Sequence, residues 1–205
     1  MKVKKGYSAL SIFVLIAVSC LTIGWADNWD QIKNAAGQVN TVKCDFVQEK
    51  HMKILAKPLV SKGVLYFKVP GFLRWEYISP VRSVLLMHNG KTKRFIMRKD
   101  GFVEDSSANL QAMGFVLKEI TMWLNGRFDE NPQFTATLKA DHKILLLPKE
   151  KSFSMMIQKI EIMLSNTPGI IKSVTIYESD NSFTKLVFKK SILNGKIDDS
   201  MFRKI

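Results

Sequence analysis

Short segments in which apolar and polar residues alternate, each ending in strong turn residues, fill most of this 205-residue sequence. A period of two is typical of strands with one buried face, and close spacing makes neighbouring strands antiparallel because parallel strands need long crossovers. Pro70-Gly71, Asn89-Gly90 and Asp100-Gly101 are among the separating turns. The sequence therefore predicts an antiparallel meander with strands over 41–47, 61–69, 72–78, 81–88, 92–99, 143–147, 153–164, 170–178 and 183–192.

Two segments have helical periodicity instead. Residues 27–40 place apolar side chains at helical spacing, with Asn28 or Asp27 available as the N-cap. Residues 108–125 carry apolar side chains around most of the helix, so this helix must pack against the sheet rather than lie on the surface. A meander with helices on one face is an α+β protein, and we predict one domain over residues 27–205.

The N-terminus has the pattern of a secretory signal peptide. Residues 1–8 contain three lysines and no acid, residues 9–24 are apolar or small, and Gly24-Trp25-Ala26 supplies small residues at the cleavage positions. We expect cleavage after Ala26. Two alternatives stay open: an uncleaved membrane anchor, or acylation of Cys20, because residues 17–20 loosely resemble the motif that precedes an acylated cysteine.

The predicted mature chain is strongly basic. Removing residues 1–26 takes away three lysines and no acid, which lowers the formal net charge from +13 to +10. The lysines are scattered, as on an ordinary soluble surface, and export makes anionic membranes or headgroups more accessible partners than nucleic acid. Cys44 is then the one remaining cysteine, so no intramolecular disulfide can form, and its alternating position predicts a buried side chain.

No motif in the sequence predicts catalysis. His51, His88 and His142 lie far apart, and none is at metal-ligand spacing from another histidine or from a cysteine. The sequence contains no glycine-rich phosphate loop, dinucleotide-binding fingerprint or hydrolase nucleophile motif. We therefore predict a binding protein with no enzymatic activity, no metal and no cofactor.

Large apolar side chains are abundant on the predicted strands, with 13 Phe, 10 Met, 4 Trp and 4 Tyr in the chain. A strongly curved sheet covered by an apolar helix can enclose a hollow, and methionine and aromatic side chains suit flexible alkyl chains. A filled core would give the same periodicity, so both alternatives stay open on this evidence. Alternation places Leu65, Phe67, Val69, Leu73, Trp75 and Tyr77 on one face, and pairs Phe95 with Met97 on a further one.

A series of short motifs follows along the chain: Phe46-x-Gln48, Pro58-Leu59-x-Ser61-x-Gly63-x-Leu65-x-Phe67, and Pro70-Gly71-x-x-Arg74-Trp75-x-Tyr77-x-x-Pro80. In order and spacing they resemble the N-terminal half of the LolA family of periplasmic outer-membrane lipoprotein carriers. Later segments are also similar to the family, so the resemblance covers most of the mature chain: Leu147-Pro148-Lys149, Glu178-Ser179-Asp180, Thr184-x-Leu186-x-Phe188, Asn194-Gly195 and Phe202.

The resemblance implies an unclosed antiparallel β-barrel whose concave face is covered by helices, with an apolar cavity between them. Such carriers shield lipoprotein acyl chains from water between an inner-membrane transporter and an outer-membrane acceptor, and the helices form a movable lid. Leu73 and Trp75 match the family's cavity-facing strand. To these two we add, as predicted lipid-binding residues, Leu65, Phe67, Val69, Tyr77, Phe95, Met97, Met113, Leu117 and Ile120.

One position departs from the family. Well-studied members place an arginine just before the proline of this motif, where it ties the sheet to the lid, but here that residue is Val69, and Arg74 is expected on the opposite face. We predict a monomeric periplasmic carrier of acylated lipoproteins or related envelope lipids. Two alternatives stay open: an outer-membrane-anchored lipoprotein or glycolipid acceptor, if Cys20 is acylated, and an envelope sensor that binds protein partners.

Overall fold

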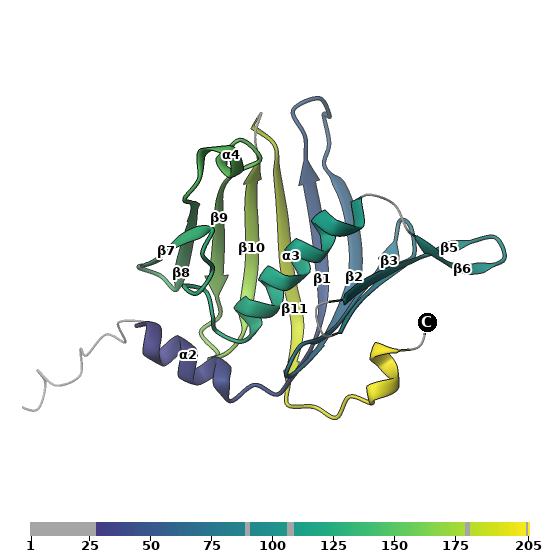
Figure 1. Ribbon diagram of the computed structural model, residues 1–205, viewed down its shortest axis with the longest axis horizontal. Coiled ribbons are helices and arrows are strands. Elements are labelled where there is room, and N and C mark those ends of the chain that lie inside the picture. The colour runs from purple at the N-terminus through teal and green to yellow at the C-terminus, as the bar shows by residue number, and fades with distance from the viewer. Residues whose placement is uncertain (1–27, 89–90, 106–108, 179–180, 204) are drawn as a thin grey trace, which may run out of the picture.

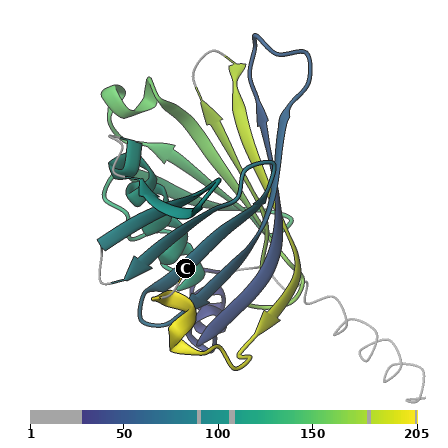
Figure 2. The same cartoon turned by 90° about the vertical axis from the view of Figure 1, so that its right-hand side faces the viewer.

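The computed structural model describes residues 28–88, 91–105, 109–178, 181–203 and 205. These residues form one antiparallel sheet with the strand order β6-β5-β4-β3-β2-β1-β11-β10-β9-β8-β7. The sheet curls strongly but does not close, because the edge strands β6 and β7 do not pair with each other (Figures 1 and 2). The strands are β1 (Thr41–His51), β2 (Leu59–Lys68), β3 (Phe72–Ser79), β4 (Ser83–His88), β5 (Lys91–Arg98), β6 (Gly101–Asp105), β7 (Phe134–Lys139), β8 (Lys143–Pro148), β9 (Ile157–Leu164), β10 (Ile171–Glu178) and β11 (Phe183–Leu193).

Helices cover the concave face, which confirms the predicted fold class. Helix α3 (Asn109–Leu124) runs obliquely across the sheet, and α2 (Trp29–Gly37) lies at one end of it (Figure 1). The short helix α4 (Lys151–Ser154) precedes β9 at the opposite end. A 3₁₀ helix, η2 (Asp199–Phe202), contacts β3 and β4. Its Phe202 is buried and packs on Phe72, so η2 covers the convex face of these strands.

Helix α2 closes one end of the hollow. Its N-cap is Asn28, as predicted, whose side chain accepts a hydrogen bond from the Gln31 amide at 2.8 Å. Ala36 is buried against Gly126, and a Cβ at Gly126 would lie 2.7 Å from that of Ala36. Gly126 also has a φ of +71°, so glycine is required there both for conformation and for space.

The expected strand over 153–164 is only partly present. Its first residues form α4, where the Ser154 amide donates to the Glu150 carbonyl at 3.0 Å, and β9 starts at Ile157. This helical turn packs Phe153 against Phe134 of β7, with ring centroids 5.4 Å apart. Tertiary packing therefore overrides the apolar run in the sequence. Strands β6 and β7 are additional to the predicted set.

A β-bulge in β11 changes which side chains reach the concave face. Lys190 and Ser191 of β11 together oppose Cys44 of β1, and Lys190 adopts a φ of +53°. The extra residue shifts the alternation along β11, so Leu193 on one side of the bulge and Phe188 on the other both face the hollow. A strict period of two would have turned one of them outward.

Candidate functional site

The concave face and α3 enclose an open apolar pocket of about 380 Å³. It occupies the end of the sheet at which β1 and β10 finish and β9 and β11 begin, on the far side of α3 from α2. The α3 helix supplies one wall and the strands supply the floor. The lining residues are Gln48, Trp75, Tyr77, Leu85, Val116, Leu117, Ile120, Met156, Ile157, Ile176, Glu178, Thr184 and Leu186.

Four polar side chains of this open pocket form two hydrogen-bonded pairs. The Tyr77 hydroxyl donates to Gln48 Oε1 at 2.8 Å, and burial raises the pKa of Tyr77 to about 12, so the hydroxyl stays protonated. Thr184 Oγ1 donates to Glu178 Oε1 at 2.9 Å, and Glu178 also forms an ion pair with Lys50. These pairs leave a mostly apolar interior with a polar border, as in sites for apolar ligands.

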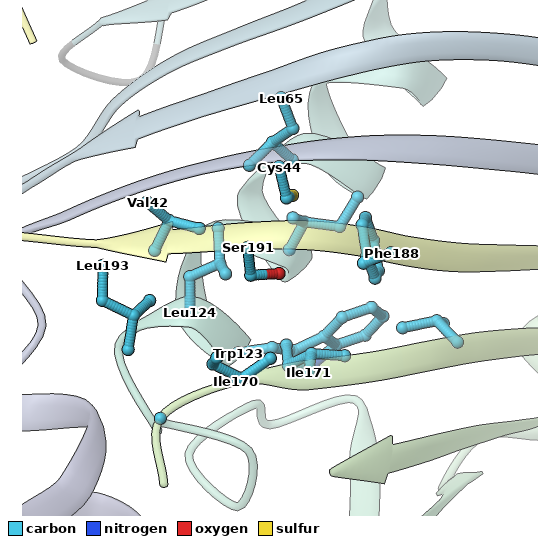
Figure 3. Close-up of a pocket in the computed structure, with 13 residues that line it drawn as sticks. Val42, Cys44, Leu65, Trp123, Leu124, Ile170, Ile171, Phe188, Ser191 and Leu193 are labelled. Carbon is cyan, nitrogen blue, oxygen red and sulfur yellow. The ribbon is translucent and has the colours of Figure 1, made fainter. Parts of the chain in front are cut away.

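Nearer to α2, the same hollow narrows to a small pocket of about 20 Å³ (Figure 3). The side chains of Cys44 and Ser191 point into it from neighbouring strands, and Trp123 and Leu124 close it from α3. Burial raises the pKa of the Cys44 thiol to about 12. The space is about that of a single water molecule, so this part of the hollow is a packed core.

An aromatic cluster lies between the two pockets. Phe46 contacts Trp75 at a centroid distance of 4.6 Å and Tyr77 at 5.2 Å, edge to face. Its ring lies over Gly63 on the neighbouring strand, where a Cβ would be 2.5 Å from the ring and 2.0 Å from the Glu76 carbonyl oxygen. Glycine at position 63 therefore gives Phe46 its place, and Phe46 divides the open pocket from the packed core.

Residues 37–204 match the family described as "Outer membrane lipoprotein carrier protein LolA". The match extends over most of the sequence and includes the strands that build both pockets. The chain belongs to the LolA family. No curated protein matches the chain at a significant level.

The solved structures to which this chain is similar have very different sequences. MucB is 13% identical, with a TM-score of 0.51 over 85% of this chain, and this chain spans 60% of the MucB chain. The Pseudomonas aeruginosa MucA/MucB complex gives 12% identity and a TM-score of 0.50 over 85% of this chain and 59% of the other. The LolA superfamily protein NE2245 from Nitrosomonas europaea is 9% identical, with a TM-score of 0.43 over 87% of this chain and 99% of that one. At these identities, the likeness to MucB concerns the fold.

The structure brings four of the predicted site residues together at the open pocket. Trp75 and Tyr77 lie on its floor, and Leu117 and Ile120 lie on the α3 wall. Leu65 instead lines the small pocket of the packed core. Met113 is in α3, but its side chain lies outside the described residues.

Three further predicted residues share the concave face but belong to the packed core and do not line the open pocket. Phe67 and Leu73 pair across β2 and β3, and both are fully buried in the core. Val69, which stands where well-studied LolA proteins have arginine, is half-buried against the same core, and its amide donates to the Asn40 carbonyl at 2.9 Å. Val69 therefore packs against the core and, unlike an arginine, makes no charged contact.

The prediction that Phe95 and Met97 face the cavity was wrong. Trp75 pairs with Leu85, and Leu85 pairs with Arg94, so Arg94 is on the concave side and Phe95 is on the convex side. Met97 follows Phe95 by two residues and shares its face. The pairing of His88 with Lys91 at the start of β5 fixes this register.

Arg74 points away from the cavity, as predicted. It is buried on the convex face, where its Nε donates to Glu76 Oε2 at 2.9 Å and its Nη1 donates to the Met201 carbonyl at 3.1 Å. This part of the motif therefore fastens the C-terminal segment to β3. Its role is structural, on the opposite side of the sheet from the open pocket.

Sequence reasoning missed much of the pocket lining. Gln48 stands in the family motif and Leu186 in an alternating strand, so both carried a usable signal. Met156 and Ile157 were hidden in the segment expected to be one continuous strand. Within the described ranges, no cluster of three or more His, Cys, Asp or Glu side chains could hold a metal ion, and no helix has the length and apolar character needed to cross a membrane.

Proposed function

We propose that this protein carries the acyl chains of lipoproteins, or of related envelope lipids, in the open pocket beneath α3. The observation that carries the proposal is a pocket of about 380 Å³ with an apolar lining, in a member of the LolA family. That volume is in the range of typical small-molecule sites, and it suits part of one extended chain better than several.

The energetics favour such a role. Each methylene removed from water contributes roughly 0.8 kcal/mol, so an acylated protein cannot cross an aqueous compartment at a useful rate without a shielding partner. The wall of the pocket includes Val116, which is 36% exposed, and Met156, which is 65% exposed. Flexible, partly exposed apolar side chains at the mouth allow a chain to enter and leave without a covalent step.

The same proposal includes the route of the protein. Residues 1–26 act as a cleaved secretory signal, residues 27–205 form a single domain, and the mature monomer works in the periplasm. It receives its load from an inner-membrane transporter and gives it to an outer-membrane acceptor. Binding and release are its activity, with no catalysis, metal or cofactor.

The decisive test measures binding of a fluorescent fatty acid by the exported, purified protein. Val116→Glu places a charge at the pocket wall from a partly exposed position, and Trp75→Glu places one in the floor. Both substitutions should reduce the affinity for the fatty acid at least about tenfold, because binding of the alkyl chain would remove the new carboxylate from water. Ile192→Glu, at an exposed position outside the pocket, is the matched control. Equal affinity in the wild type and a folded Val116→Glu protein would overturn the proposal.

The cargo and the mature N-terminus can be read in one further experiment. Native mass spectrometry of protein purified from the envelope, with lipid extraction alongside, should find a chain that begins at Asp27 with lipid or acylated peptide bound. A chain that begins at modified Cys20 would replace the soluble carrier with an anchored acceptor. A protein with an unloaded pocket and no affinity for the fatty acid would favour a sensor that binds protein partners.

A further inference from the structure

The loops at the mouth of the open pocket carry exposed apolar side chains. Ile54, in the loop between β1 and β2, is 86% exposed, and Met155 and Met156, between α4 and β9, are 67% and 65% exposed. The Leu55 amide donates to the Met52 carbonyl at 2.9 Å, which makes a tight turn with Ile54 near its tip. This turn leaves the apolar side chain of Ile54 exposed to solvent.

Both loops lie at the same end of the sheet. The β1–β2 loop and α4 project from the end of the sheet at which β10 finishes (Figure 1). Glu178 at the end of β10 pairs with Ile157, directly after Met156, and both residues line the open pocket. Met156 thus belongs to the pocket and to the exposed tip, so an apolar path leads from outside the molecule to the cavity.

The charge around these tips is positive. Lys53 and Lys57 flank Ile54 in a loop that has no acidic residue. Lys149 and Lys151 accompany the α4 tip, with Glu150 as the single acid between them. At the pocket border, Glu178 is already paired with Lys50, so it adds no free negative charge.

We infer that the two tips dock the pocket mouth onto an anionic lipid bilayer. Apolar side chains at a loop tip insert at the boundary between headgroups and acyl chains, and nearby lysines attract anionic headgroups. An exposed apolar tip flanked by lysines is the loop counterpart of a basic amphipathic helix. The inference rests on the proposed function, since docking brings the pocket mouth to the place where acyl chains leave or enter a membrane.

Vesicle flotation of the exported protein tests the inference. Wild-type protein should float with vesicles of phosphatidylethanolamine and phosphatidylglycerol, and salt should weaken the binding. Ile54→Asp combined with Met155→Asp should reduce partitioning at least about tenfold, as should Lys53→Glu combined with Lys57→Glu. Neither pair lines the open pocket, so affinity for the fluorescent fatty acid should remain unchanged.

A matched control uses the opposite end of the sheet. Ile192 is 55% exposed and Lys196 is also exposed, so Ile192→Asp with Lys196→Glu makes one substitution of each kind away from the mouth. This variant should float like the wild type. Failure of the wild type to float, equal binding to phosphatidylcholine vesicles, or equal losses in control and tip variants would each overturn the inference. Binding of the tip only to a purified protein partner would do so too. Loss of fatty-acid binding in the wild type would instead refute the proposed function.

Discussion

The two halves of the concave face differ in what their side chains do. Near α2, the space between α3 and the sheet is about 20 Å³, and Cys44 and Leu65 are almost completely buried. Beyond Phe46 the same strands line about 380 Å³, and Val116 and Met156 remain accessible. One continuous set of strands thus provides a core that stabilises the fold and a cavity that stays open. The boundary between them is a single aromatic ring over a glycine.

Thiol chemistry should reveal the largest contrast between the two halves. Because burial raises the pKa of Cys44 to about 12, its thiolate fraction at neutral pH is about a thousandfold below that of an exposed thiol. Cys44 should therefore react with a thiol reagent such as DTNB only when the protein unfolds. In a Cys44→Ala background, Met156→Cys should react as an exposed thiol does. Rapid labelling of native Cys44 would show that the packed half opens.

Substitution of the boundary glycine should have the largest effect on stability. Gly63→Ala places a methyl group against the Phe46 ring and the Glu76 carbonyl, so it should lower the free energy of unfolding by about 3 kcal/mol. Gly71→Ala meets no atom within 4 Å and should change it by less than about 0.5 kcal/mol. Urea denaturation measures both values. Equal stabilities would mean that Phe46 and β3 can shift without cost.

The sequence predicts which strands and helices form better than it predicts which face of a strand each side chain occupies. The turn residues and the period of two predict the antiparallel meander, and the helical periodicity of 108–125 predicts α3. The direction of a strand's faces needs the register as well. Phe95 was assigned to the wrong face because that choice followed apolar character, whereas the pairing of His88 with Lys91 determines which residues of β5 face the hollow.

A β-bulge and long-range packing determine the features that the sequence did not predict. The bulge at Lys190 has no glycine to signal it, yet it decides that Leu193 and Phe188 face the same hollow. The α4 turn depends on contact between Phe153 and Phe134, which are distant in sequence. Whether an apolar face is filled or hollow depends on such long-range geometry, so periodicity alone could not separate cavity from core.

A pair of truncations should separate stability from binding. Leu65→Ala removes a side chain that is 1% exposed and should cost about 2.5 kcal/mol, with fatty-acid affinity unchanged. Met156→Ala should change stability by less than about 0.5 kcal/mol and weaken fatty-acid binding. Thermal unfolding and fluorescence titration supply the two readouts. If both variants lost stability and affinity together, the halves would not be independent.

The smallest expected effect is pH-dependent and concerns α3. Glu119 is 3% exposed, and burial raises the pKa of its carboxyl group, although a hydrogen bond with Asn131 opposes this. The neutral form is therefore favoured in the folded state, so the stabilising contribution is complete below about pH 4 and is lost as the pH rises through the folded-state pKa. Glu119→Gln should stabilise the protein by about 1 kcal/mol at pH 7.

Denaturation curves over a range of pH test this sign. The stability advantage of Glu119→Gln should shrink as the pH falls and should disappear below about pH 4, where wild-type Glu119 is protonated in both states. An advantage that stayed constant with pH would mean that the glutamine improves packing and that the carboxyl group is not the cause.

The absence of hydrogen bonds between β6 and β7 has a mechanical consequence. A closed barrel has a circumference set by its ladder, so widening it requires backbone bonds to break. An open sheet resists widening only through the bending and twisting of its strands, while every ladder stays intact. The sheet around the hollow can then bend so that its edge strands β6 and β7 move apart, and the cavity volume can change at low energetic cost.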